Sequence, residues 1–237
     1  MRLVILTNEQ LKEELLSTGV SDDCKIDWIS SPKELLSHTN TDALIDLLFE
    51  DNSYDVSHLN DYLRKPVFVN SMNKTIVEIG LPVIRINAWP GFLKRNIAEV
   101  CSTGGNKNEA EKILSLLNRK AEWVPDLKGF ISPRVVSMII NEAYFALEEN
   151  VSTKEEIDIA MKLGTNYPYG PFEWSKIIGL KNIAGLLTEL LVAKVSKSYN
   201  KIENSSGITD YYAPFFSFLY ITETMRSIIY RIIDGSE

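Results

Sequence analysis

Residues 129–180 constrain the fold of this chain more than any other part of the sequence. After Pro133, which suits the first turn of a helix, apolar residues recur at helical spacing. Ser152 and Thr153 each have a glutamate three residues on, so either could form a capping box that starts a second helix. We expect Gly164 to end this helix in the left-handed conformation, and the Pro/Gly-rich segment after it to form a rigid turn. The stretch therefore predicts two helices, a capped junction and a turn.

The same stretch resembles the start of the C-terminal helical domain of the 3-hydroxyacyl-CoA dehydrogenase family. The family's motifs occur in order and almost without gaps: Gly129-Phe130-Ile131, Arg134, Asn141-Glu142-Ala143, Ile157-Asp158, Ala160-Met161-Lys162, Gly164, Pro168, Gly170 to Glu173, and Gly179-Leu180. The resemblance implies an NAD-dependent oxidoreductase that acts on 3-hydroxyacyl-CoA in fatty-acid metabolism. It also implies a homodimer through the C-terminal helices, because the helical domain is the dimer interface in this family.

The composition is that of an ordinary globular protein without a nucleic-acid partner. The net charge is −7, whereas a protein that neutralises phosphates needs a basic surface. Cys24 and Cys101 lack the spacing of metal ligands and fit a reduced, cytoplasmic compartment. No apolar run approaches the length of a membrane span. We therefore expect a cytoplasmic protein with no metal site and no membrane contact.

Short apolar segments alternate with helical ones through the first half of the chain, which is typical of an open, mainly parallel sheet. We predict a shortened Rossmann-like domain over residues 1–126 and a helical C-terminal domain over residues 127–237, so the fold class is α/β followed by all-α. The predicted strands are 2–6, 25–29, 42–49, 66–69 and 82–86, and the predicted helices are 9–16, 55–63, 106–117 and a short one that begins at Ser31-Pro32. The alternation alone is equally compatible with an α/β domain that binds nothing.

The first turn of this half does not have the glycines that NAD binding requires. A dinucleotide-binding turn brings bare backbone and a helix N-terminus to the pyrophosphate. Here the turn is Thr7-Asn8-Glu9-Gln10, and Glu9 adds a negative charge where phosphates would lie. Between the first helix and Asp42 there is a single strand, whereas the family has a longer excursion that supports the adenosine. We therefore expect the NAD binding that the resemblance implies to be weak or absent.

The position of the family's catalytic histidine is occupied by Asn87. An amide hydrogen-bonds a carbonyl, but it has no basic nitrogen to take the hydroxyl proton. The family's catalytic glutamate corresponds to Glu99. No imidazole is left for Glu99 to orient. We therefore slightly favour a solvated or salt-bridged carboxylate over a catalytic role for Glu99.

Two further family positions differ. The family's serine corresponds to Asn73, or less directly to Ser71, and its asparagine corresponds to Pro133, which has no side-chain donor; Arg134 is retained. The histidines are expected to be exposed surface residues rather than replacements for the missing base; the chain has two, His38 and His58.

Three functions are compatible with these residues. The first is a working 3-hydroxyacyl-CoA (3-hydroxybutyryl-CoA) dehydrogenase with an atypical site. The second, which we favour, is a diverged relative without effective hydride transfer, with Asn73, Asn87 and Glu99 lining a cleft between the domains for an acyl-CoA-like ligand. The third is a homodimeric scaffold or interaction protein, which the apolar residues 215–233 at the end of the chain would also suit.

Overall fold

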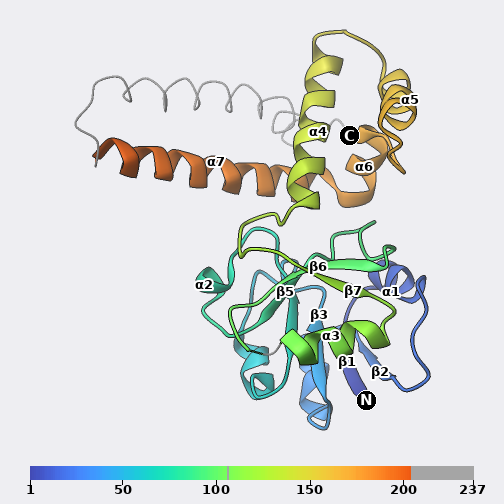
Figure 1. Ribbon diagram of the computed structural model, residues 1–237, viewed down its shortest axis with the longest axis vertical. Coiled ribbons are helices and arrows are strands. Elements are labelled where there is room, and N and C mark those ends of the chain that lie inside the picture. Colours follow the sequence, from blue (N-terminus) through green and yellow to red (C-terminus); the bar gives the residue numbers. More distant parts are fainter. Residues whose placement is uncertain (106, 204–237) are drawn as a thin grey trace. The chain divides into compact units, whose positions relative to one another are not determined.

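The computed structural model describes residues 1–105 and 107–203, so the apolar segment 215–233 lies outside the described part. The chain divides into two compact units, Met1–Ile131 and Ser132–Glu237, and in Figure 1 their described residues run from blue to green and from yellow-green to orange-red, respectively. None of the described helices is both long enough and apolar enough to span a membrane.

The first unit is built on a seven-stranded sheet with the order β2-β1-β3-β4-β5-β6-β7. Neighbouring strands are parallel except for the antiparallel pair β5 and β6. The strands are β1 (Arg2–Leu6), β2 (Lys25–Ile29), β3 (Ala43–Asp46), β4 (Val67–Asn70), β5 (Ile84–Ile86), β6 (Ile97–Cys101) and β7 (Lys120–Trp123). The predicted fold class is confirmed, although β6 and β7 were not predicted.

Helical segments cover both faces of this sheet and create a core on each side. One core joins the sheet to α1 and α3, and the other joins it to the 3₁₀ helices η1 and η2. The helical elements are α1 (Glu9–Leu16), η1 (Pro32–Ser37), η2 (Ser57–Tyr62), α2 (Ile76–Ile79) and α3 (Lys107–Leu116). Strand side chains alternate between the two faces, and both faces are covered. The strands are therefore short, continuous apolar runs in the sequence.

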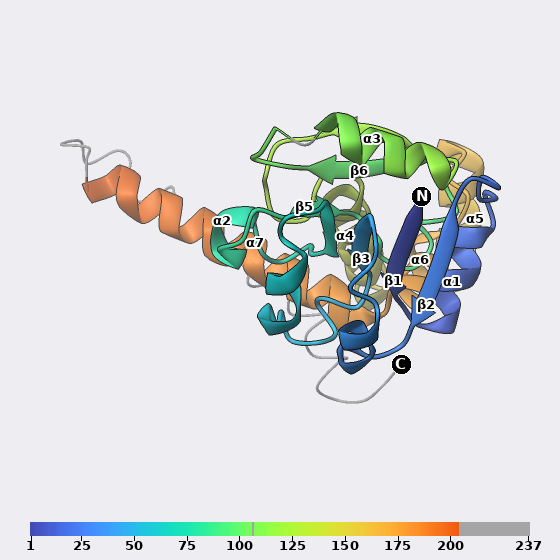
Figure 2. The same cartoon turned by 90° about the horizontal axis from the view of Figure 1, so that it is seen from below.

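The strand order reverses between β1 and β3, where Figure 2 shows the strands side by side. The connection through α1 places β2 on one side of β1, and the connection through η1 places β3 on the other. Ligands of open α/β sheets bind at such a point, beyond the carboxyl ends of the strands. β2 is the edge strand and the single strand between α1 and β3, as the sequence predicted.

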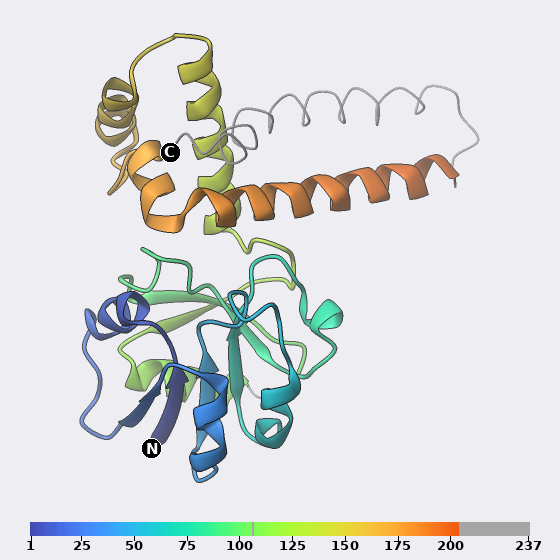
Figure 3. The ribbon, with the colours of Figure 1, turned by 180° about the vertical axis from the view of Figure 1, so that it is seen from behind.

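The second unit is helical, with α4 (Ser132–Glu148), α5 (Lys154–Thr165), α6 (Pro171–Ile178) and α7 (Leu180–Glu203), shown from behind in Figure 3. Thr153 is the N-cap of α5 and forms the capping box with Glu156. The expectation for Gly164 was wrong, because α5 continues to Thr165 and the left-handed residue that ends it is Asn166, with φ of 55°.

Several residues that carry the family resemblance contact Asp158. Its carboxylate accepts the backbone N–H groups of Phe172 at 2.8 Å and Glu173 at 3.2 Å, so a side chain of α5 caps the start of α6. Lys162 pairs with Glu173 at 2.6 Å. Gly170 is required because an added Cβ would lie 2.3 Å from an Asp158 oxygen. The motif residues therefore hold two helices together.

Candidate functional site

Asn87 and Glu99 form a buried pair at the carboxyl end of β5. The Asn87 side-chain Nδ2 donates to Glu99 Oε2 at 3.0 Å, and the two residues are 4% and 6% exposed. The backbone N–H of Asn87 also donates to the Glu99 carbonyl oxygen at 2.9 Å, because β5 and β6 are antiparallel here. The structure corrects our expectation of a solvated or salt-bridged Glu99: it is a buried carboxylate whose side-chain partner is Asn87.

The Asn87 amide is held in one orientation. Its Oδ1 accepts the backbone N–H of Trp89 at 3.4 Å, while its Nδ2 donates to Glu99. The second Nδ2 proton can donate to a ligand carbonyl or hydroxyl oxygen. The Asn87 amide cannot take up a proton near neutral pH, so Asn87 supplies a hydrogen bond but is not a general base.

Glu50, on the turn after β3, is a polar group of this region that the sequence did not reveal. Its Oε1 accepts the backbone N–H groups of Met72 and Asn73, at 2.7 and 2.9 Å, and the Tyr54 hydroxyl at 2.8 Å. Its Oε2 accepts the Trp89 indole N–H at 3.3 Å. Burial raises the pKa of the Glu50 carboxyl, against the opposing effect of these donors.

Ser71 and Asn73, which we matched to the family's serine from the sequence, lie on the loop after β4. The Ser71 hydroxyl is fully buried and donates to the Lys74 carbonyl, so it is committed to the loop. Asn73 is joined to Glu50 through its backbone, and its buried Oδ1 has no hydrogen-bond partner. Pro133 lies in the other unit, in the first turn of α4, where its missing N–H has no intrahelical role.

The turn between β1 and α1 does not fit the pyrophosphate of NAD. Asn8 is the N-cap of α1, and its Oδ1 accepts the Leu11 N–H at 2.9 Å, which uses one of the amides a phosphate would need. Glu9 lies in the first turn, 3.3 Å from Lys12. The helix N-terminus thus carries its own acceptor and its own negative charge.

The loop that follows Asn87 is fixed to α1 instead. Both carboxylate oxygens of Glu14 accept the Gly91 N–H, at 2.9 and 2.8 Å, and burial raises the pKa of Glu14. The buried Arg119 guanidinium donates to the carbonyls of Leu93, Glu14 and Leu15, and burial lowers its pKa to about 10. These contacts make α1 a support for the Trp89–Leu93 loop.

One histidine contradicts our expectation. The His58 side chain is 7% exposed, and its Nε2 lies 2.8 Å from Oδ2 of the fully buried Asp46 at the end of β3. Its Nδ1 is buried without a partner. His38 ends η1, with Nδ1 3.3 Å from Asp27, and is partly exposed. The predicted surface position was therefore wrong for His58, because the polar residues around it in the sequence gave no sign of its buried contact with Asp46.

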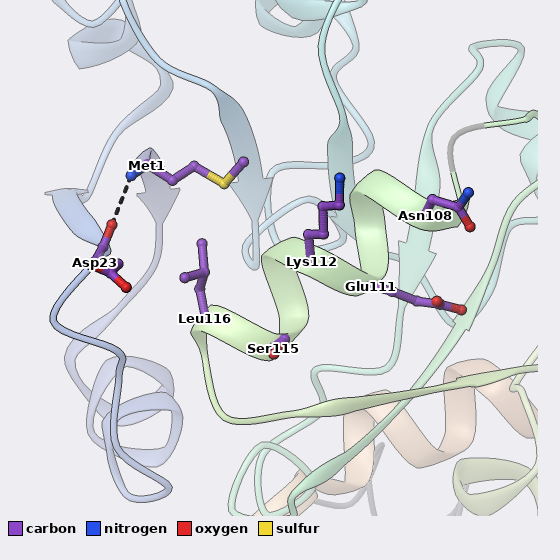
Figure 4. Close-up of a pocket in the computed structure, with 7 residues that line it drawn as sticks. All are labelled: Met1, Asp23, Asn108, Glu111, Lys112, Ser115 and Leu116. Carbon is purple, nitrogen blue, oxygen red and sulfur yellow. Dashed lines mark hydrogen bonds between the residues drawn. The ribbon is translucent and has the colours of Figure 1, made fainter.

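A shallow hollow of about 720 Å³ lies between α3 and the start of β1. Figure 4 shows Met1 and Asp23 facing the side chains of α3, with the N-terminal ammonium donating to the Asp23 carbonyl at 2.7 Å. β1 begins beside it, whereas Asn87 follows the carboxyl end of β5, so the hollow is separate from the site. In the described part of the chain, no three His, Cys, Asp or Glu residues are grouped to hold a metal ion.

Comparison with known proteins identifies the helical unit. Residues 129–206 match the model of the 3-hydroxyacyl-CoA dehydrogenase C-terminal domain. This part of the chain therefore resembles the C-terminal domain of the 3-hydroxyacyl-CoA dehydrogenases. It is 29% identical over 150 residues to the 3-hydroxyadipyl-CoA dehydrogenase of Escherichia coli, a match that covers 63% of this chain and 32% of that protein.

Two other dehydrogenases match this chain over a larger share of their own length. The 3-hydroxybutyryl-CoA dehydrogenase of Clostridioides difficile is 29% identical over 189 residues, which cover 69% of this chain and 67% of that protein. The crystal structure of the (S)-3-hydroxybutyryl-CoA dehydrogenase of Ralstonia eutropha aligns with a TM-score of 0.62 at 18% identity, covering 81% of this chain and 87% of that one. This likeness establishes the shared fold.

Proposed function

We propose that this chain is a diverged 3-hydroxyacyl-CoA dehydrogenase relative that keeps a site for an acyl-CoA or similar small ligand and has lost most or all NAD-dependent hydride transfer. The observation that carries the proposal is the Asn87–Glu99 pair, with its 3.0 Å hydrogen bond. At the position of the family's general base, an amide is locked onto the retained glutamate. Removing a general base lowers a rate by about 10²- to 10⁴-fold.

The region where a dinucleotide would bind supports the same conclusion. The amides at the start of α1 face Asn8 and Glu9, and β2 is followed directly by η1. Glu34, the first acidic residue after β2, accepts the N–H groups of Ser30 and Ser31 and so already has partners. Loss of the phosphate contacts and of the general base together should leave little turnover.

The ligand side of the proposal follows from the groups that remain. Asn87 has one amide proton to give, and the Asn73 Oδ1 is buried without a partner. Buried polar atoms of this kind usually meet a ligand or water. Because the named relatives are dehydrogenases of 3-hydroxyadipyl-CoA and 3-hydroxybutyryl-CoA, we propose an acyl-CoA thioester as the ligand.

We also propose a cytoplasmic homodimer that forms through the helical unit. Apolar side chains remain exposed on its helices, including Val135 and Met138 on α4 and Leu163 on α5, which is 83% exposed. Apolar surface of this kind is what a second copy would cover. A scaffold protein would use the same surface without any ligand, so ligand binding decides between these two functions.

A turnover assay tests the loss of hydride transfer. Purified protein is mixed with NADH and acetoacetyl-CoA, and the nicotinamide absorbance is followed, with a working dehydrogenase of the family as the positive control. We expect no turnover above background. Clear NADH oxidation would mean that the chain is a working dehydrogenase with an atypical site.

Thermal shift separates a ligand-binding protein from a scaffold. We expect 3-hydroxybutyryl-CoA to raise the unfolding temperature and NADH to leave it unchanged, since a ligand stabilises only the state that binds it. If neither ligand changes it, the scaffold function is favoured instead.

A further inference from the structure

Glu50 is a partly buried carboxylate whose hydrogen-bond partners are all uncharged. They are the N–H groups of Met72 and Asn73, the Tyr54 hydroxyl and the Trp89 indole N–H. The donors come from three segments: the turn after β3, the loop after β4 and the loop after β5. The carboxylate therefore joins the loops that follow three neighbouring strands, β3, β4 and β5.

None of the ion pairs of the described residues neutralises this charge. Four donors favour the ionised form, yet they leave a net negative charge in place. The nearest cation that the contacts reveal is Lys74, whose Nζ lies 4.3 Å from the centre of the Tyr54 ring rather than against the carboxylate. A partly buried charge with uncharged neighbours acts over several ångströms, because water screens it less than it screens an exposed charge.

Glu50 is connected to the candidate site through Trp89. The indole of Trp89 donates to Glu50 at 3.3 Å, and the backbone N–H of the same residue donates to Asn87 Oδ1 at 3.4 Å. Trp89 is 1% exposed, so this connection is fixed by packing. A single residue, Trp89, thus lies between the Glu50 carboxylate and a ligand that bonds to the Asn87 amide.

We propose that Glu50 determines the charge of the acyl groups that the site accepts. Thioesters with an uncharged or cationic acyl end are bound, and those with a terminal carboxylate are rejected. The inference rests on the proposed acyl-CoA site and specifies its ligand class. It separates this chain from relatives whose ligand carries a second carboxylate, such as the substrate in the name of the 3-hydroxyadipyl-CoA enzyme.

Three thioesters that differ at a single group test this on the unmodified protein. In butyryl-CoA, 3-aminopropionyl-CoA and succinyl-CoA, the end of the acyl chain is a methyl, an ammonium and a carboxylate group, respectively. Isothermal titration should give a Kd for succinyl-CoA at least about tenfold weaker than that for butyryl-CoA, with 3-aminopropionyl-CoA at least as tight as butyryl-CoA.

The Glu50→Gln variant assigns the effect to its residue. It keeps the size of the side chain and removes the charge, so the ratio of the Kd values for succinyl-CoA and butyryl-CoA should fall by several-fold. Glu14→Gln is the matched control, because it removes another buried carboxylate that accepts a backbone N–H of the 89–93 loop, from α1. This control should leave the ratio unchanged. The three-ligand series decides the outcome even if Glu50→Gln does not fold.

The results distinguish this inference from the function on which it rests. Equal affinity for butyryl-CoA and succinyl-CoA would overturn the role of Glu50 and leave the thioester site intact. A ratio that Glu14→Gln lowers as much as Glu50→Gln would also overturn it. Absence of binding by all three thioesters would overturn the proposed site together with this inference.

Discussion

Gly170 lies against the Asp158 carboxyl group, which occupies the space that a side chain would need. The backbone of Gly170 is extended, with φ of −73°, so the requirement for glycine is one of space and not of conformation. Asp158 cannot move without losing its two hydrogen bonds to the start of α6. The residues that most clearly identify the family are therefore residues that stabilise the helical unit.

Replacing this glycine should destabilise the helical unit. We expect Gly170→Ala to lower the free energy of unfolding by about 2–4 kcal/mol, from overpacking and from weakened capping bonds. Urea unfolding followed by circular dichroism measures it. Gly164→Ala is the control, since Gly164 lies within α5 and an added Cβ meets nothing within 4 Å, so stability should stay equal or rise. Equal effects of the two substitutions would contradict the packing around Asp158.

The buried carboxyl groups of Glu14 and Asp46 and the partly buried one of Glu50 predict the pH dependence of stability. Burial raises the pKa values of Glu14, Asp46 and Glu50 above their ordinary range. A raised pKa in the folded state means that folding favours the protonated form, so stability is lost as the pH rises through the folded pKa values. The free energy of unfolding should therefore increase when the pH is lowered from 7 to about 5.

At lower pH the effect should reverse. Hydrogen bonds lower the pKa values of the more exposed Asp27 and Glu173, so these groups lose their contribution as the pH falls through their folded values. Urea unfolding at a series of pH values tests the profile. Glu50→Gln should flatten its rise between pH 7 and 5, and a profile that decreases steadily from pH 7 would contradict the account.

Arg85, at the centre of β5, fixes the segment that follows β7. It is fully buried, its Nε and one terminal nitrogen donate to the Ser71 carbonyl, and the other terminal nitrogen lies 2.5 Å from Asp126. Asp126 in turn accepts the first N–H of α2 at 2.8 Å. One buried ion pair thus ties β5, α2 and the segment after β7 together.

Breaking this pair from one side should be costly. We expect Arg85→Met to lower the free energy of unfolding by about 3–5 kcal/mol, because it leaves Asp126 partly buried without its charged partner. The double variant Arg85→Met/Asp126→Leu should recover part of that loss, since no unpaired charge remains. Chemical denaturation of both variants gives the values. An Arg85→Met variant as stable as the unmodified protein would contradict the structural role of the pair.

The sequence predicted those helices and strands whose ends are determined by local patterns. β1, α1 and β2 have the predicted bounds, because each is a short apolar run or a capped helix with clear ends. β6 and β7 were missed because neither strand has a pattern of its own that distinguishes it from a loop. The predicted helix over residues 55–63 is the 3₁₀ helix η2, a difference of hydrogen bonding that apolar spacing does not report.

The candidate site was predicted only in part, for a related reason. Asn87 and Glu99 were located through family motifs, but their hydrogen bond depends on the antiparallel pairing of β5 and β6. Glu50 lies on an irregular turn, and its partners come from distant loops, so no local signal marks it. His58 was taken for a surface residue because its partner, Asp46, is twelve residues away.

At the scale of the whole molecule, the two units resemble the 3-hydroxyacyl-CoA dehydrogenases in different features. The helical unit keeps the residues of the family that cap and pack its helices, as Asp158 and Gly170 show. The sheet unit keeps the strand order with its reversal at β1, but the polar groups at its carboxyl edge bond mainly to one another. A shared fold is therefore compatible with the loss of cofactor chemistry that we propose.

The most direct test of this account is an isothermal titration of NADH into the unmodified protein, at a protein concentration that detects dissociation constants up to the millimolar range. With Asn8 and Glu9 at the helix N-terminus, we predict no saturable binding. A micromolar dissociation constant with one site per chain would contradict the account, because it would show that the dinucleotide site survives without its glycine turn.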